Sequence, residues 1–256
     1  GLTTKWENIR GWIKPAGALA TIGIAASIGL MALFGHYVLS LSWSVSFLLG
    51  AITAPTDSAA VFSVLRGLPL PASVRATLEA ESGLNDAPTV LMVAAMTALA
   101  TGHEPHGGLL GLAALIVVEL AGGIALGLAT GFLGVFVMRR IALPNSGLYP
   151  LAALAWAVAA YGTGVAVHVS GFAAVYICAL ILGNGQLPHR HAVRSFAEGI
   201  GWIAQIGLFV MLGLLASPSR LTWATIATGL AAGLFLTFVV RPLSVIASVS
   251  WFRVPA

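Results

Sequence analysis

Residues 108–138 read GLLGLAALIVVELAGGIALGLATGFLGVFVM, with Glu119 as the one charged residue and Arg139 and Arg140 directly after the run. A helix needs about 20 mostly apolar residues to cross the hydrocarbon core of a bilayer, and this run is longer than that. It therefore predicts a transmembrane helix that ends where the two arginines follow.

The rest of the chain has the same apolar character. Hydrophobic residues make up 59% of the 256 residues, charged residues make up 8%, and the mean hydropathy is +0.98. A soluble domain carries about 25% charged residues, so most of this surface is expected to face lipid. The net charge of +4 does not indicate nucleic-acid binding, because the basic residues lie between apolar runs. With Cys178 as the single cysteine, no disulfide can form within the chain.

Apolar runs bounded by charge, proline or glycine predict an all-α membrane protein with about eight transmembrane helices. The expected ranges are 15–39, 43–65, 72–99, 108–138, 148–169, 171–183, 196–216 and 221–249. We treat residues 1–256 as a single transmembrane domain. Because the chain opens on Gly1 without a preceding methionine and ends soon after an apolar run, it is interpreted as an internal fragment of a longer protein.

The basic residues of the predicted loops support this layout. When the loops are assigned alternately to the two sides, one side receives all of them except Arg220; they are Lys5, Arg10, Lys14, Arg66, Arg75, Arg139, Arg140, Arg190, Arg194 and Arg253. Arg241 falls within the last predicted helix. The positive-inside rule then predicts that the basic side is cytoplasmic.

Asp57 lies near the middle of the second predicted span, where a carboxylate is costly. It is about 21 Å beyond Trp43 along the helix axis. Pro55 removes a backbone donor and disfavours helix at the residue before it, and Thr56 could cap a restarted helix. Such a break leaves backbone carbonyls for a cation and is tolerated where it lines a protein cavity. The alternative is a simple proline kink with Asp57 in a buried hydrogen bond.

The third predicted span carries a cluster of polar residues over 79–86. Helical spacing places Glu79, Ser82 and Asp86 along one face and Glu81 and Asn85 on the adjacent stripe. Asp86 is about 21 Å into its helix, near the depth of Asp57. Carboxylate and hydroxyl oxygens from Asp57, Asp86, Ser82 and Thr56 suit a monovalent cation. Burial and like-charge repulsion favour protonation when the cation is absent, so one site can hold either a proton or a cation.

These residues resemble a known family. Thr56-Asp57 followed by Glu81-Ser82-Gly83-Leu84-Asn85-Asp86 is similar to the NhaP-like branch of the cation:proton antiporter superfamily. The stretches 1–6, 56–63 and 209–214 are similar to its potassium/proton, cell-volume-regulating members. The resemblance implies an inverted-repeat antiporter fold, an inner-membrane location, a homodimer and a role in pH homeostasis. It implies no cofactor beyond the transported potassium or sodium and the proton.

The resemblance also assigns roles to individual residues. Asp86 would bind cation and proton alternately, and Asp57, Ser82 and the Thr56 backbone would complete the ion's shell beside Pro55. Asn85 stands where electrogenic relatives carry a second aspartate, which implies electroneutral exchange.

Glu81 would pair with an arginine of a late helix. In the family that arginine belongs to a Gly-Leu-Arg-Gly segment that is missing here, and Arg241 is the alternative within the chain. The second broken helix of the repeat would likewise lie beyond Ala256, and the N-terminal and C-terminal helices of the family are expected to be absent from residues 1–256.

Two further features have structural interpretations. Glu119 is expected to be a buried hydrogen-bonding residue, with an ion ligand as the alternative. Gly123, Gly127 and Gly131 recur every four residues and should allow close helix packing, in the core or in a dimer contact.

The predicted function is exchange of a monovalent cation for protons by alternating access. A proton-gated channel and a non-transporting membrane scaffold remain alternatives. An intramembrane hydrolase is less favoured, because it would give Pro55 and Asn85 no role; we therefore expect no enzyme activity.

Overall fold

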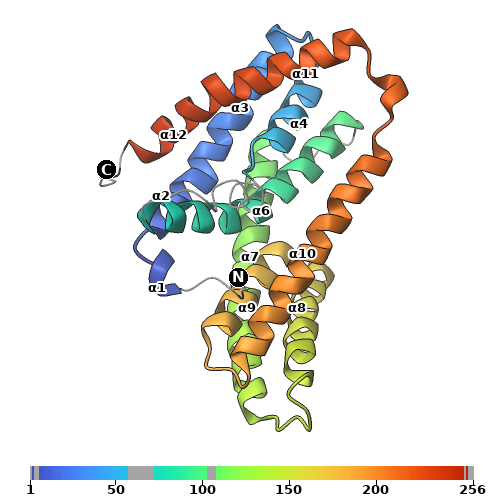
Figure 1. The fold of residues 1–256 in the computed structure, drawn as a ribbon. Coiled ribbons are helices and arrows are strands. Elements are labelled where there is room, and N and C mark those ends of the chain that lie inside the picture. Colours follow the sequence, from blue (N-terminus) through green and yellow to red (C-terminus); the bar gives the residue numbers. More distant parts are fainter. Residues whose placement is uncertain (1, 3–5, 57–71, 103–107, 251, 253–256) are drawn as a thin grey trace. The chain divides into compact units, whose positions relative to one another are not determined.

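The chain forms a helical membrane protein. A computed structural model describes residues 2, 6–56, 72–102, 108–250 and 252, and these contain helices and no strand (Figure 1). Five helical stretches are long and apolar enough to span a membrane: Ile13–Tyr37, Gly111–Arg140, Leu148–Ala166, Arg190–Leu215 and Trp223–Val249. Three shorter apolar helices cover Trp43–Thr53, Leu84–Ala100 and Gly171–Asn184. The predicted all-α fold with about eight membrane helices is confirmed.

The chain divides into two compact units. One unit contains residues 1–6 and 119–225, and the other contains residues 7–118 and 226–256. The division falls inside two helices, α7 (Gly108–Arg140) and α11 (Trp223–Phe235). We describe each unit separately and name them, by their longer continuous segments, the 119–225 unit and the 7–118 unit.

The 7–118 unit brings together helices from both ends of the chain. Its helices are α2 (Ile13–Ala18), α3 (Ile24–Tyr37), α4 (Trp43–Thr53), α6 (Ala72–Ala100), most of α11 and α12 (Arg241–Val249). α3 and α4 pack closely, since a Cβ atom at Gly50 would lie 2.6 Å from the Ile28 carbonyl oxygen. The rings of Phe34 and Phe235 stack with their centroids 4.4 Å apart, and this contact joins α3 to α11.

Two wide π-helical turns interrupt the helices of this unit, at Leu19–Gly23 and at Leu236–Val240. In the second, the Arg241 N–H donates to the Leu236 carbonyl oxygen, five residues back. Pro242 follows directly and has no N–H to donate, which weakens the regular bonding pattern at this point. The last predicted span is therefore continuous in length but not regular in geometry.

The 119–225 unit is built around α7, α8 (Leu148–Ala166), α9 (Gly171–Asn184) and α10 (Arg190–Leu215). α10 begins at Arg190, six residues before the predicted start. Its first turns carry polar residues, so the prediction, which was based on apolar runs, did not include them. Arg194 nevertheless packs inside the unit, where its Nη2 donates to the Gly183 carbonyl oxygen at 3.0 Å.

The glycines of α7 form the contact with α9. A Cβ atom at Gly127 would lie 2.6 Å from the Ala174 carbonyl oxygen, and one at Gly131 would lie 2.7 Å from the Ile181 side chain. A Cβ atom at Gly123 would collide with the Ser170 carbonyl oxygen. The predicted role of these glycines in close helix packing is confirmed, and the partner helix lies within the same chain.

Replacing Gly127 by alanine should destabilise the 119–225 unit by about 1–3 kcal/mol, because α9 must move away to admit the methyl group. The thermal unfolding midpoint of the purified protein in detergent measures this effect. The matched control is Gly162→Ala on α8, where a Cβ atom would meet nothing within 4 Å. Equal midpoints for the two variants would contradict the close approach of α7 and α9.

Candidate functional site

The candidate site lies where α4 ends. α4 stops at Thr53, and Ala54 and Pro55 form a bend before Thr56. Pro55 cannot continue the helical hydrogen-bond pattern, because its nitrogen carries no hydrogen. The predicted interruption is therefore present on its N-terminal side. Residues 57–71, which include Asp57 and the predicted restart of the helix, lie outside the described part.

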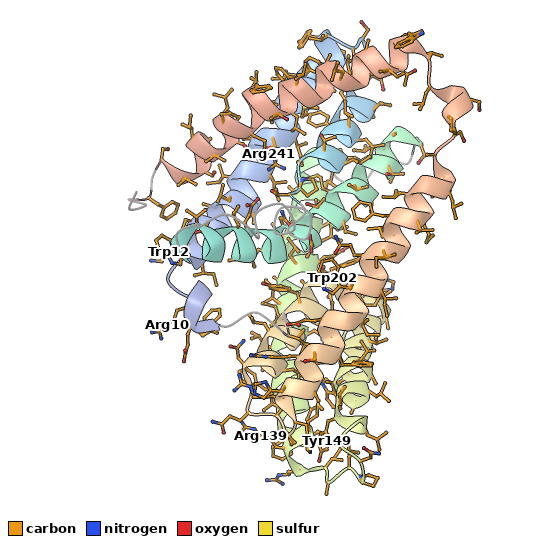
Figure 2. The ribbon with its side chains drawn as sticks, in the orientation of Figure 1. Arg10, Trp12, Arg139, Tyr149, Trp202 and Arg241 are labelled. Atoms are coloured by element: carbon orange, nitrogen blue, oxygen red, sulfur yellow. The ribbon has the colours of Figure 1, made fainter. Side chains whose placement is uncertain are left out.

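Arg241 extends from α12 to this helix end (Figure 2). Its Nη2 donates to the Ala54 carbonyl oxygen at 2.6 Å, and its Nη1 donates to the Thr56 hydroxyl oxygen at 3.2 Å. A guanidinium presents several donors in one plane, which suits two acceptors that lie close together. One cation from a distant segment thus holds both the last carbonyl before the break and the first side chain after it.

Thr56 connects Arg241 to α6. The same hydroxyl that accepts from Arg241 donates to Glu81 Oε1 at 2.8 Å. The Thr56 carbonyl oxygen accepts a long hydrogen bond of 3.5 Å from Asn85 Nδ2. Glu81 and Asn85 are one helical turn apart, so both reach the same residue. The arrangement is a continuous chain from Arg241 through Thr56 to Glu81.

Burial makes this chain energetically important. Glu81 is 7% exposed and Asn85 is fully enclosed. A buried charge that lacks an opposite charge or hydrogen-bond partners is strongly destabilising. The charges of Glu81 and Arg241 interact, and the shared Thr56 hydroxyl satisfies part of the hydrogen-bonding capacity of both. The network therefore ties the broken end of α4 to α6 and α12.

The structure describes the side chains of some predicted ion ligands but not of others. Thr56 lies in the network, and Pro55 beside it is half-buried. Asp86 follows Asn85 on α6 and its side chain is exposed, whereas Asn85 points inward. Ser82 belongs to α6, but its side chain, like that of Glu79, lies outside the described part. The roles of Asp57, Ser82 and Asp86 as ion ligands stay predictions.

Arg241 was undervalued by the sequence argument. The family pattern placed the arginine partner of Glu81 in a Gly-Leu-Arg-Gly segment, whereas the structure brings Arg241 to the Glu81 network from α12. The available signal was its position inside an apolar span. A charged residue at membrane depth normally has a partner, and this rule applies to arginine as well as to acids.

Glu119 shows a different outcome. Its backbone carbonyl oxygen accepts from the Ser170 N–H at 3.0 Å, close to where α7 meets α9. Its side chain is half-buried and makes no hydrogen bond with the residues that the structure describes. The hydrogen-bonding role predicted for this carboxylate is thus not found there.

Comparison with known proteins places the chain. The family described as "Sodium/hydrogen exchanger, transmembrane" matches residues 1–256. The K(+)/H(+) antiporter NhaP of Alkalimonas amylolytica is 35% identical over 261 residues, covering 100% of this chain and 44% of the relative. The K(+)/H(+) antiporter NhaP2 of Shewanella oneidensis is 32% identical, covering 99% of this chain and 44% of the relative. The Na(+)/H(+) antiporter NhaP of Pseudomonas aeruginosa is 29% identical over 89% of this chain and 55% of the relative.

A solved structure has the same fold. The sodium proton antiporter MjNhaP1 from Methanocaldococcus jannaschii superimposes with a TM-score of 0.80, at 23% sequence identity, over 98% of this chain and 62% of that one. The chain spans 44% of the length of the two K(+)/H(+) antiporters. It belongs to the sodium/hydrogen exchanger family of transmembrane proteins.

Proposed function

We propose that the whole protein exchanges a monovalent cation, potassium or sodium, for protons across the membrane without net charge movement. Asp86 is the carboxylate that holds either the cation or the proton, and Asp57, Ser82 and Thr56 supply further oxygen ligands. The observation that carries the proposal is the Arg241–Thr56–Glu81 network at the broken end of α4, directly beside Asn85 and Asp86. Membership of the exchanger family supports it.

The network fits an exchange site because the charges of Arg241 and Glu81 stay the same through the cycle, whereas the charge of Asp86 changes. The positive charge of Arg241 and the negative charge of Glu81 offset each other inside the unit, and Asn85 adds no charge. The charge that changes then lies on Asp86. An Asp86 carboxylate with a bound monovalent cation and a protonated Asp86 have the same net charge, so each half of the cycle moves the site in the same electrical state.

The proposed cycle is alternating access. A deprotonated Asp86 binds the cation on one side, the part of the protein that carries the site moves, and the cation leaves on the other side. A proton then takes its place for the return. The break in α4 lets backbone oxygen atoms near Thr56 take part, since residues outside regular helix have carbonyls free of helical bonds.

Several further assignments go with this function. The protein lies in the cell inner membrane with its basic loops in the cytoplasm, acts as a homodimer in contact with lipid, and contributes to pH homeostasis. It needs no cofactor and has no enzyme activity. The relatives that carry antiporter names support the assignment to secondary transport.

The full-length protein in liposomes with a pH dye inside tests the proposal. Imposed potassium or sodium gradients should each be tried with the membrane potential clamped at zero. Proton flux that follows one cation and saturates with its concentration identifies exchange and names the ion. A rate that stays the same when a membrane potential is imposed shows that the exchange is electroneutral. Absence of coupled flux from well-folded protein would refute exchange, and non-saturating cation flux without protons would identify a channel.

A further inference from the structure

Thr89 on α6 holds its hydroxyl differently from six other threonines that lie in helices or directly after one. Those threonines donate to the carbonyl oxygen four residues earlier, at 2.7–3.0 Å; they are Thr21, Thr53, Thr97, Thr101, Thr130 and Thr163. Thr89 is 9% exposed, and its hydroxyl oxygen is buried without a hydrogen-bond partner among the described residues. A buried hydroxyl without a partner is costly, so this orientation needs a cause.

A second unsatisfied oxygen lies one turn away on the same helix. Asn85 is fully enclosed, and while its Nδ2 donates to the Thr56 carbonyl, its Oδ1 has no partner within the described part. Residues four apart on a helix have Cβ atoms about 5–6 Å apart, and side chains lean toward the helix N-terminus. The Thr89 side chain therefore leans over the turn that contains Asn85.

Pro88 leaves a third oxygen atom in this turn, the Leu84 carbonyl oxygen, without its helical donor. It lies inside α6, and as proline it cannot donate to the carbonyl of Leu84, four residues earlier. The Leu84 carbonyl thus loses its regular helical partner in the same turn. The three oxygen atoms are neutral, and together they offer one hydroxyl donor and two acceptors.

We propose that a buried water molecule binds between Thr89, Asn85 and Leu84. It accepts from the Thr89 hydroxyl and donates its two hydrogens to Asn85 Oδ1 and to the Leu84 carbonyl oxygen. Three hydrogen bonds are typical of an enclosed structural water. Water fits better than a transported cation, because this set contains no charged ligand.

The water makes Thr89 a positioning residue for the exchange site, and this part rests on the proposed function. With Oδ1 held by the water, the amide of Asn85 keeps its Nδ2 directed at the Thr56 carbonyl oxygen. Thr56 is the residue through which Arg241 and Glu81 are linked. Loss of the water releases the Asn85 amide and loosens the backbone at the break in α4. Cation affinity should therefore fall more than the maximal transport rate.

The test uses the full-length protein with Thr89→Val, which keeps the shape and removes the hydroxyl, and Thr89→Ser, which keeps the hydroxyl. Thr97→Val on the same helix is the matched control, since the Thr97 hydroxyl is exposed and bonds Val93. We expect Thr89→Val to lower the thermal midpoint by about 2–4 °C. It should also raise the apparent KM for the cation several-fold with a smaller change in maximal rate. Thr89→Ser and Thr97→Val should resemble the wild type.

A hydroxyl that truly lacks a partner gives the opposite result. In that case valine removes an unsatisfied group, and Thr89→Val would be as stable as the wild type or more stable, which overturns the proposal. A high-resolution map of the full-length protein supplies the second test, with density expected between Thr89 Oγ1 and Asn85 Oδ1. Density there that appears only with the transported cation would identify an ion and also overturn it. If the wild type shows no exchange, the proposed function fails while the midpoints and the map still test the water.

Discussion

Asp86→Asn is expected to abolish cation-dependent proton flux, leaving the rate of protein-free liposomes. Asparagine has nearly the same shape as aspartate, but its neutral amide can neither take up a proton in the cycle nor neutralise a bound cation. Because the variable charge of the proposed cycle lies on this one side chain, no slower version of the cycle remains. Folding should be retained, since Asp86 is exposed on α6 while its neighbour Asn85 supplies the buried contact. Flux with imposed potassium and sodium gradients measures the effect.

Glu198→Gln is the matched control for loss of a carboxylate. Glu198 is exposed on α10, in the 119–225 unit, and is remote in sequence from both motifs. This variant should keep the wild-type flux. Substantial coupled exchange by a purified Asp86→Asn protein with a normal thermal midpoint would remove Asp86 from its proposed role and require another carboxylate.

Arg241→Gln is expected to be the most destabilising single change in the described part of the 7–118 unit. It leaves the Glu81 carboxylate buried without its cation and frees the Ala54 carbonyl oxygen from its donor. Removing one member of a buried charged pair costs about 3–5 kcal/mol. Glu81→Gln should cost a similar amount, because it leaves the arginine unbalanced. Yield of folded protein and its thermal midpoint in detergent report both losses.

The double variant Glu81→Gln/Arg241→Gln separates a coupled pair from two independent contacts. If the charges balance each other through Thr56, the double variant should be more stable than the sum of the two single losses predicts. Arg139→Gln, at an exposed arginine whose Nε donates to the Gln186 carbonyl oxygen, controls for the substitution itself. Strictly additive losses from Glu81→Gln and Arg241→Gln would argue against coupling.

The helices could be predicted closely from the sequence because each apolar run is a local property. Charge and glycine mark the ends of α7 and α9 within two residues, and the proline before Thr56 marks the end of α4. Lipid requires every backbone group to bond within its own segment, so an apolar run of this length has few alternatives to a helix. The start of α10 was missed because its first turns are polar.

The partner of Glu81 could not be predicted in the same way. Arg241 and Thr56 are separated by 185 positions in the chain, and helical periodicity gives the face of a residue but not the helix that covers it. Thr89 was overlooked because the sequence does not reveal that its buried hydroxyl lacks the usual hydrogen bond to the carbonyl four residues earlier. The Arg241–Thr56–Glu81 contact depends on how α6, α12 and the end of α4 pack, which is a property of the assembled unit.

The wide turn at Leu236–Val240 has a consequence for the angular position of Arg241. A π-helical turn contains one residue more than an α-helical turn, so every side chain beyond it is rotated around the helix axis. In uninterrupted α-helix the same residue would be displaced by about 100°, the rotation per residue, and would face away from Ala54 and Thr56. The turn thus rotates all later side chains around the helix axis, and the geometry of residues 236–240 decides whether a buried glutamate meets its counter-charge.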